Sequence, residues 1–168
     1  MKDAACWIEK LNLQRHPEGG WFKEIYRSGE TISAESLPDR YGEKRCLSTC
    51  IYYMLEANDQ SVFHRLKSDE FWHFYTGTSA IKLSVISPEG NLTQHLLGAD
   101  PDYDEVFQLL IPRNHWFAAE LTNKEGYALI GCTVSPGFEF SDFEMAQRTK
   151  LSTLFPQHQK LIQKLTRE

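Results

Sequence analysis

The sequence contains no pair of cysteines at the spacing of a zinc or redox motif. Its cysteines are Cys6, Cys46, Cys50 and Cys132, and none forms a CxxC pair. A zinc knuckle or a thioredoxin-like motif therefore has no support. We expect free thiols that are buried or half-buried, as in cytoplasmic proteins.

Long apolar runs and an excess of positive charge are also missing. No stretch approaches the about 18 apolar residues of a membrane-spanning helix, and Asp3, Glu9 and Lys10 interrupt the N-terminal segment, so it lacks a signal-peptide core. The net charge is −5 and the isoelectric point is about 5.7. The chain thus lacks the basic footprint of proteins that bind nucleic acid or anionic membranes. We therefore expect neither nucleic acid nor a membrane as a partner. We expect a cytoplasmic location.

Apolar and aromatic residues are plentiful enough for one large core. The chain has 168 residues, of which 41% are hydrophobic and 12% aromatic. This length fits one domain better than two. We expect a single domain over residues 1–168, with aromatic side chains available for a pocket.

The N-terminal segment has the pattern of an amphipathic helix. Asp3 can cap it, and its apolar residues recur at i, i+3, i+4 and i+7 up to about residue 13: Ala4, Trp7, Ile8 and Leu11. The segment His16-Pro17-Glu18-Gly19-Gly20 then ends the helix, because proline fixes one torsion and paired glycines allow unusual ones. Glu18 could reach the mouth of a pocket.

The middle of the chain, about residues 21–134, is predicted to be a β-barrel or sandwich. Short β-prone segments alternate with turns: 21–26, 47–55, 61–64, 71–75, 81–86, 92–97, 106–111, 116–121 and 127–134. Residues 28–43 are polar and are expected to form a loop. Residues 135–168 are expected to be extended and then helical, with Pro156 in a first helical turn.

One segment resembles the first metal-binding motif of the cupins. In that motif His-x-His is followed by Glu and later by Gly. His64, Glu70 and Gly77 stand at three of these positions, whereas Leu66 replaces the second histidine.

The second cupin motif, Pro-x-Gly-x-x-His, is matched more loosely. Pro112 is retained, and Asn114 stands where glycine is usual, which still suits a left-handed turn. Phe117 replaces the final histidine.

Longer segments are similar to a subfamily of small, uncharacterised single-domain cupins. They are 16–21 (HPEGGW), 63–70, 72–74 and 131–138. The resemblance implies an all-β fold with flanking N-terminal and C-terminal helices, the double-stranded β-helix (jelly-roll) barrel. It also implies a homodimer, and no activity is established for the subfamily.

The residues at the cupin metal positions do not predict a tightly held metal. The family uses three histidines and one glutamate, and only His64 and Glu70 remain here. Two protein ligands rarely hold a transition metal. An alternative is a divalent metal held by His64, Glu70 and His115, since His115 shares strand parity with Phe117.

A ligand pocket inside the barrel is the main functional hypothesis. Its predicted lining combines a histidine and a glutamate, which are also the candidate catalytic residues, with apolar walls: His64, Leu66, Glu70, Trp72, Phe74, His115 and Phe117. Trp72 and Phe74 share the parity of Glu70 and should point inward, whereas His73 should point outward. The alternative is that these aromatic residues simply fill the barrel.

Three classes of function remain open at this level. The first is binding of a small organic ligand without a cofactor. The second is an epimerase or isomerase related to the sugar-nucleotide epimerases, with His64 as general base and Tyr52, Tyr53 or Tyr75 as acid. The third is a metal-dependent dioxygenase. Outward aromatic residues such as Phe71 and Tyr75 favour a homodimer.

Overall fold

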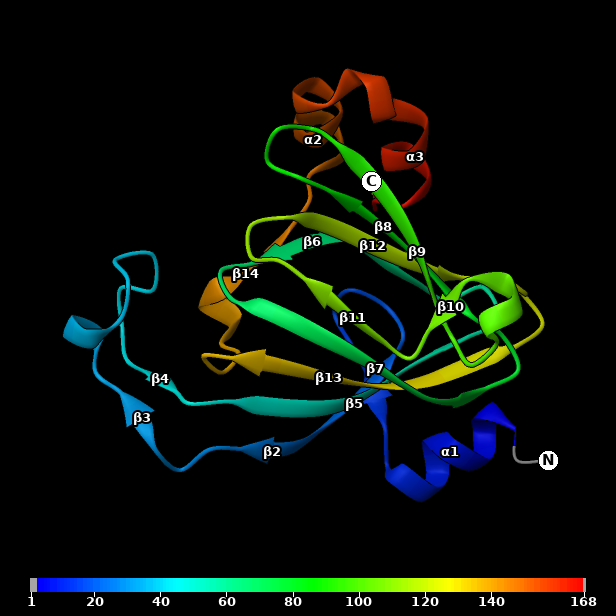
Figure 1. Ribbon diagram of the computed structural model, residues 1–168, viewed down its shortest axis with the longest axis horizontal. Coiled ribbons are helices and arrows are strands. Elements are labelled where there is room, and N and C mark those ends of the chain that lie inside the picture. The colour runs from blue at the N-terminus through cyan, green and yellow to red at the C-terminus, as the bar shows by residue number, and fades with distance from the viewer. Residues whose placement is uncertain (1–2, 168) are drawn as a thin grey trace.

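Two six-stranded β-sheets stacked face to face form the body of the protein (Figure 1). The computed structural model describes residues 3–167, so the predicted domain ends, residues 1 and 168, lie outside the described residues. The strand order is β1-β2-β5-β13-β7-β11 in the first sheet and β10-β9-β8-β12-β6-β14 in the second, and β3 pairs with β4 separately. The predicted all-β jelly roll with flanking helices is confirmed.

The strands of the two large sheets have these bounds: β1 Gln14–Arg15, β2 Trp21–Arg27, β5 Thr49–Glu56, β6 Gln60–Leu66, β7 Asp69–Gly77, β8 Ile81–Ile86, β9 Leu92–Leu97, β10 Glu105–Val106, β11 Gln108–Ile111, β12 Trp116–Leu121, β13 Tyr127–Ser135 and β14 Phe143–Met145. The remaining elements are: β3 Thr31–Ile32, β4 Arg45–Cys46, α1 Ala4–Leu11, α2 Arg148–Leu154, α3 Gln159–Lys164, and the 3₁₀ turns η1 Ala34–Ser36, η2 Pro101–Tyr103, η3 Phe140–Asp142 and η4 Pro156–His158.

The main core lies between the two sheets. Side chains alternate along each strand, so every second residue of the central strands points inward. The inward set is almost wholly apolar and includes Tyr53, Leu83, Phe117 and Ile130, each at most 1% exposed.

Helix α1 covers the outer face of the first sheet. The carboxylate of Asp3 accepts a hydrogen bond from the Cys6 amide at 2.9 Å, as the sequence predicts for an N-cap. Trp7 and Ile8 pack against a buried group that includes Met54 and Leu129. The helix ends at Leu11, slightly earlier than predicted.

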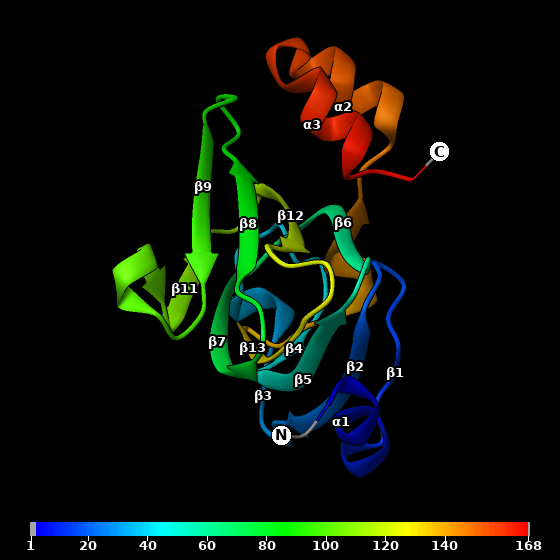
Figure 2. The same cartoon turned by 90° about the vertical axis from the view of Figure 1, so that its right-hand side faces the viewer.

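The C-terminal segment forms two short helices where the sequence suggested one. Helices α2 and α3 pack together over the outer face of the second sheet, far from α1 (Figure 2). Leu151 of α2 and Ile162 of α3 bury their side chains against Phe63 and Trp116. Pro156 lies in the first turn of η4, between the helices.

Several short strands escaped prediction. β1, β3, β4 and β14 have two or three residues each, too few to show a periodic pattern, and β3 lies inside the stretch predicted as a loop. His73 points away from the core and contacts the Thr133 hydroxyl, as parity predicts. Phe71 and Tyr75 are 43% and 49% exposed on the same outer face, and the homodimer remains a prediction. Within residues 3–167 no helix is long and apolar enough to cross a membrane.

Candidate functional site

A pocket enters the barrel between the two sheets, beneath the segment 137–143. Its cavity volume is about 100 Å³, which is below the roughly 300–1,000 Å³ of pockets that take drug-sized ligands and leaves room for a small molecule only. Its walls come from the turn after β1, from the strands β2, β5, β6, β7 and β13, and from the segment 137–143. We call it the Glu18 pocket, after the carboxylate buried in it.

Glu18 and His64 form a buried polar pair in this pocket. Oε2 of Glu18 lies 3.1 Å from Nε2 of His64, and the two side chains are 8% and 2% exposed. The other oxygen, Oε1, accepts a hydrogen bond from the Ser61 hydroxyl at 2.9 Å. Both side chains are therefore held in fixed positions by neighbouring groups.

The contacts of His64 determine where its protons lie. Its Nδ1 is 2.7 Å from the carbonyl oxygen of Val62, which can only accept, so Nδ1 carries a hydrogen. The contact between Nε2 and Glu18 then requires one further proton between the two atoms. The pair is either an imidazolium with a carboxylate or a neutral imidazole with a carboxylic acid, and one proton is shared.

Glu18 reaches the pocket because the turn that carries it is pressed against β6. Gly19 has a φ of +114°, and a Cβ there would collide with the carbonyl oxygen of Gln60. The Val62 amide donates to the Glu18 carbonyl at 3.0 Å. The Tyr53 hydroxyl donates to the Gly19 carbonyl at 2.8 Å. The paired glycines thus allow the close approach that places the carboxylate inside the barrel.

His16 is a second histidine of the pocket, with the opposite proton arrangement. Its Nδ1 accepts a hydrogen bond from the Glu18 amide at 3.3 Å, which assigns the ring hydrogen to Nε2, and the same Nδ1 lies 3.5 Å from Oε2 of Glu18. Burial lowers the pKa of His16, although the nearby charge of Glu18 acts in the other direction. The ring is therefore a neutral imidazole with its hydrogen on Nε2. Phe22 lies edge-on to it at 4.6 Å between ring centroids.

Glu70 is the second carboxyl group in the pocket. Burial raises the pKa of Glu70 to about 8, and the charge of Glu18 contributes to the increase. At neutral pH this side chain is mostly a carboxylic acid, able to donate a proton. Burial and the charge of Glu70 also raise the pKa of the neighbouring Cys132 thiol, so it is not a nucleophile at neutral pH.

The raised pKa of Glu70 predicts a pH dependence of stability. Between its ordinary pKa of 4.5 and about 8, the folded protein retains a proton that the unfolded chain has released. Stability should therefore fall as pH rises through this window, by about 1.4 kcal/mol per pH unit from this group alone. Glu70→Gln should remove that part of the slope in urea unfolding measured from about pH 5.5 to about 7.5. Glu9→Gln, at an exposed position, is the control, and an unchanged slope in Glu70→Gln would contradict the assignment.

Aromatic rings and one group of ion-paired side chains surround the mouth of the pocket. Phe138, Phe140 and Phe143 contact one another edge-on, with ring centroids 5.1–6.3 Å apart. Arg27 of β2 bridges Glu24 and Glu139 at 2.9 and 2.7 Å. The mouth thus has an apolar side and a charged side.

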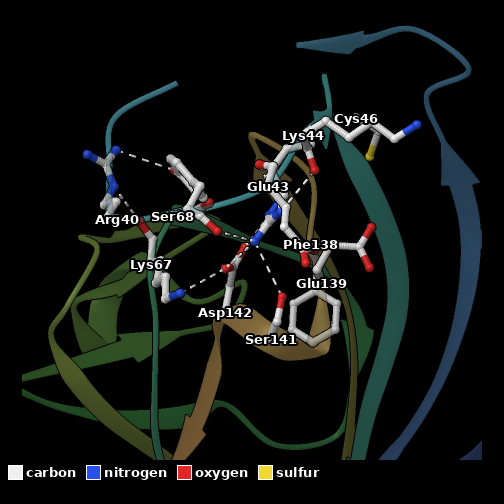
Figure 3. A network of polar contacts seen from close by, with 12 residues as sticks. Arg40, Glu43, Lys44, Cys46, Lys67, Ser68, Phe138, Glu139, Ser141 and Asp142 are labelled. Atoms are coloured by element: carbon white, nitrogen blue, oxygen red, sulfur yellow. Dashed lines mark hydrogen bonds and ion pairs between the residues drawn. The ribbon is translucent and has the colours of Figure 1, made fainter. Parts of the chain in front are cut away.

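A buried ion pair anchors the segment that carries these aromatic rings. Nε and Nη2 of Arg45 lie 2.6 and 2.7 Å from the two carboxylate oxygens of Asp142, and both residues are buried. Lys67 approaches the same carboxylate at 3.4 Å, and Ser141 lies beside it (Figure 3). Asp142 directly precedes Phe143, so this contact determines where the aromatic side of the mouth lies.

Only part of the predicted site lines the Glu18 pocket. His64, Leu66 and Glu70 line it. Trp72 points inward, as parity predicts, but lies about 7 Å further along β7 than Glu70, in the closed core. Phe74 is two residues further still, and packs at the margin of that core.

The remaining two predicted residues have different positions. Phe117 is buried beside the pocket, with its ring centroid 4.0 Å from that of His64, and supports the imidazole without lining the space. His115 lies in the turn before β12, where strand parity does not apply, and its Nδ1 contacts the Arg113 carbonyl at 3.1 Å. Asn114 in this turn has a φ of 62°, the left-handed conformation expected of it.

Several pocket residues were not assigned to the site from sequence. His16, Phe22 and Phe143 belong to segments far apart in the chain from His64. Of the tyrosines considered as acids, Tyr53 lines the pocket, while Tyr52 and Tyr75 contact each other on the outer face. Burial raises the pKa of Tyr53 well above its usual value. The paired glycines after Glu18 were the one sequence signal that indicated this region.

The residues at the cupin metal positions do not fit a metal ion. Both ring nitrogens of His64 are engaged, by Val62 and by Glu18. Leu66 and Phe117 offer no donor atoms. Within residues 3–167, no group of three or more His, Cys, Asp or Glu side chains is arranged to hold a metal ion.

Comparison with known proteins agrees with this architecture. The family model described as Cupin superfamily (DUF985) matches residues 5–146. The chain belongs to the cupin superfamily. A yeast relative, the uncharacterized protein YML079W of Saccharomyces cerevisiae, is 31% identical over 145 residues, covering 80% of this cupin and 71% of the yeast protein.

Solved structures similar to this cupin include two that match over nearly its whole length. Protein SO0799 from Shewanella oneidensis has 37% identity and a TM-score of 0.89, with 99% of each chain covered. A hypothetical protein from Leishmania major has 31% identity and a TM-score of 0.90, with 99% and 100% covered. Oxalate decarboxylase from Bacillus subtilis shares the fold alone, at 14% identity and a TM-score of 0.53, and this cupin spans 36% of its chain.

Proposed function

We propose that this cupin binds a small organic molecule in the Glu18 pocket, without a resident metal ion or cofactor. The observation that carries the proposal is the buried pair of Glu18 and His64 in an otherwise largely apolar cavity. Removing such a polar pair from water costs free energy, whereas filling the same space with apolar side chains would not. Perturbed ionisable groups gathered in a pocket are typical of functional sites.

The wall of the pocket suits an organic molecule of modest size. Phe22, Ile51 and Val134 supply apolar surface, and Phe143 closes one side. Three polar groups with fixed or shifted protons, those of His16, Glu18 and Glu70, face the same space. A ligand would bury its apolar part against the rings and satisfy its polar atoms on these groups.

A thermal-shift screen of small metabolites tests this proposal. A ligand that binds only the folded protein, present at 100 times its Kd, adds about 2.7 kcal/mol of stability, which raises the Tm by about 5 °C or more. Leu66→Trp should fill the pocket and abolish the shift, whereas Glu144→Gln, on an exposed side chain of β14, should retain it. If no compound raises the Tm of the wild-type protein, the proposal is wrong.

Proton transfer on the bound molecule, as in an isomerase or epimerase, is a second candidate function. The favouring observation is the contrast between two carboxyl groups in one pocket. Glu18 shares a proton with His64, while burial raises the pKa of Glu70 to about 8. When two carboxyl groups in one pocket have such different surroundings, one can accept a proton and the other can donate one. Here Glu18 would accept the proton and Glu70 would donate it.

Within this candidate, the base is Glu18. Both nitrogens of His64 are engaged within the protein, so the imidazole cannot itself reach a ligand atom. Glu18 keeps carboxylate lone pairs that neither His64 nor Ser61 occupies. His64 then acts as the positioning residue that holds the carboxylate, and Glu70 returns a proton to the ligand.

A further inference from the structure

The charged groups at the pocket mouth restrict the kind of ligand that can enter. Among the described residues that line the pocket, Arg27 is the one lysine or arginine, against three carboxylates, Glu18, Glu24 and Glu139, and the largely protonated Glu70. An anionic ligand needs unpaired donors or net positive charge. The first question is therefore whether Arg27 has donors to offer.

All five N–H groups of Arg27 already have acceptors. Nε and Nη2 donate to the two carboxylate oxygens of Glu24 at 3.2 and 2.9 Å, and Nη2 also donates to the Phe138 carbonyl at 3.1 Å. Nη1 donates to Glu139 at 2.7 Å and approaches the Cys46 sulfur at 3.7 Å. A phosphate would have to displace two carboxylates from this guanidinium. The mouth therefore disfavours phosphate and nucleotide groups.

One donor of the pocket, by contrast, is unused. His16 is neutral with its hydrogen on Nε2, because Nδ1 accepts from the Glu18 amide. Its side chain is 8% exposed, its ring lines the pocket, and Nε2 has no hydrogen-bond partner among residues 3–167. An N–H group that lines a cavity without a protein acceptor can donate to an acceptor on a bound ligand.

We propose that the ligand is an uncharged carbonyl compound whose oxygen accepts a hydrogen bond from Nε2–H of His16. The inference rests on the proposed ligand-binding function and specifies its ligand class. A carbonyl oxygen is a pure acceptor and matches a neutral donor. It also makes the neighbouring C–H group acidic, which is what a base such as Glu18 requires.

The chemistry of this arrangement balances within the pocket. Glu18 takes the proton from the carbon next to the carbonyl group, and the C–H electron pair moves into a carbon–carbon double bond. The carbonyl π electrons pass to the oxygen, which becomes an enolate stabilised by the His16 hydrogen bond. Glu70 returns a proton to carbon, and solvent resets both carboxyl groups. No oxidant, metal or cofactor takes part.

The proton positions can be tested without any ligand. Nitrogen-15 NMR of the histidine rings distinguishes the two neutral tautomers, and His16 is expected to carry its hydrogen on Nε2. His64 is expected to carry hydrogen on Nδ1. A His16 ring protonated on Nδ1, or on both nitrogens at neutral pH, would overturn the inference.

Titration with cyclohexanone and with inorganic phosphate tests the ligand class. Cyclohexanone should shift the His16 Nε2 signal in a saturable way, and phosphate at the same concentration should not. His16→Phe keeps a flat ring but loses the donor, so its affinity for cyclohexanone should fall at least tenfold. His16→Gln retains an amide donor and should recover part of the affinity, and His95→Phe, at a half-buried position of β9 outside the pocket, should bind as the wild type does.

The outcomes separate this inference from the proposed function. Equal cyclohexanone binding by wild type and His16→Phe would overturn the role of His16 and leave ligand binding standing. Competition by phosphate would overturn the ligand class. If cyclohexanone does not bind the wild type while the metabolite screen yields a ligand without a carbonyl group, the inference fails alone. If neither yields a ligand, both fail.

Discussion

Asp142→Asn is expected to lower the free energy of unfolding by about 3–5 kcal/mol, because it breaks a buried ion pair and leaves a charge behind. Arg45 is 1% exposed, and Asp142 accepts from two of its nitrogens. The asparagine removes the negative charge while the guanidinium stays buried without full compensation. Urea unfolding at neutral pH, analysed by linear extrapolation, measures the change.

A second ion pair provides a matched control. Arg65 and Glu144 lie 2.7 Å apart, but their side chains are 36% and 56% exposed. Glu144→Gln should therefore change stability by at most about 1 kcal/mol. Replacing both buried partners, as Arg45→Met with Asp142→Leu, should recover much of the loss. Equal effects of Asp142→Asn and Glu144→Gln would show that burial does not determine the contribution of the pair.

Glu18→Gln is expected to slow proton exchange on a bound carbonyl compound by at least about 100-fold, the usual contribution of a positioned general base. The glutamine side chain has the same shape and can donate a hydrogen bond to Nε2 of a neutral His64. The variant thus retains the position of the side chain and removes its ability to accept a proton. Deuterium entering the carbon next to the carbonyl group of cyclohexanone in heavy water, followed by NMR, measures the rate.

The control for this experiment is a buried carboxylate outside the pocket. Glu120 on β12 is 8% exposed and pairs with Lys124 and Lys164. Glu120→Gln should exchange deuterium at the wild-type rate. A wild-type protein that exchanges no faster than buffer would exclude the proton-transfer function, and equal rates in wild type and Glu18→Gln would exclude Glu18 as the base.

Much of the fold could be predicted from local patterns. The helical spacing of Ala4, Trp7, Ile8 and Leu11 and the regular series of β-prone segments give the helices and sheets, since both patterns follow from which side chains must be buried. Strands of two or three residues could not be predicted, because they form only where a neighbouring strand provides hydrogen-bond partners. The helix α2 escaped for a related reason, since packing against α3 and the second sheet stabilises it.

The candidate site was predicted only in part. Parity correctly separated inward Trp72 from outward His73, but it gives no information about depth along the barrel. Glu70 lines the pocket and Trp72 lies in the core because the two residues are at different positions along the barrel axis. His115 could not be placed, because parity applies within a strand and this residue precedes one.

The sequence by itself determined the fold class and three pocket residues, His64, Leu66 and Glu70, because these depend on spacing along neighbouring strands. The tertiary structure alone decided the chemistry of the site. The HPEGG turn closes against β6 and brings Glu18 to 3.1 Å from His64, and the same turn fixes the proton of His16. Proton positions and pKa values depend on contacts between segments distant in the chain, and no local pattern encodes those contacts.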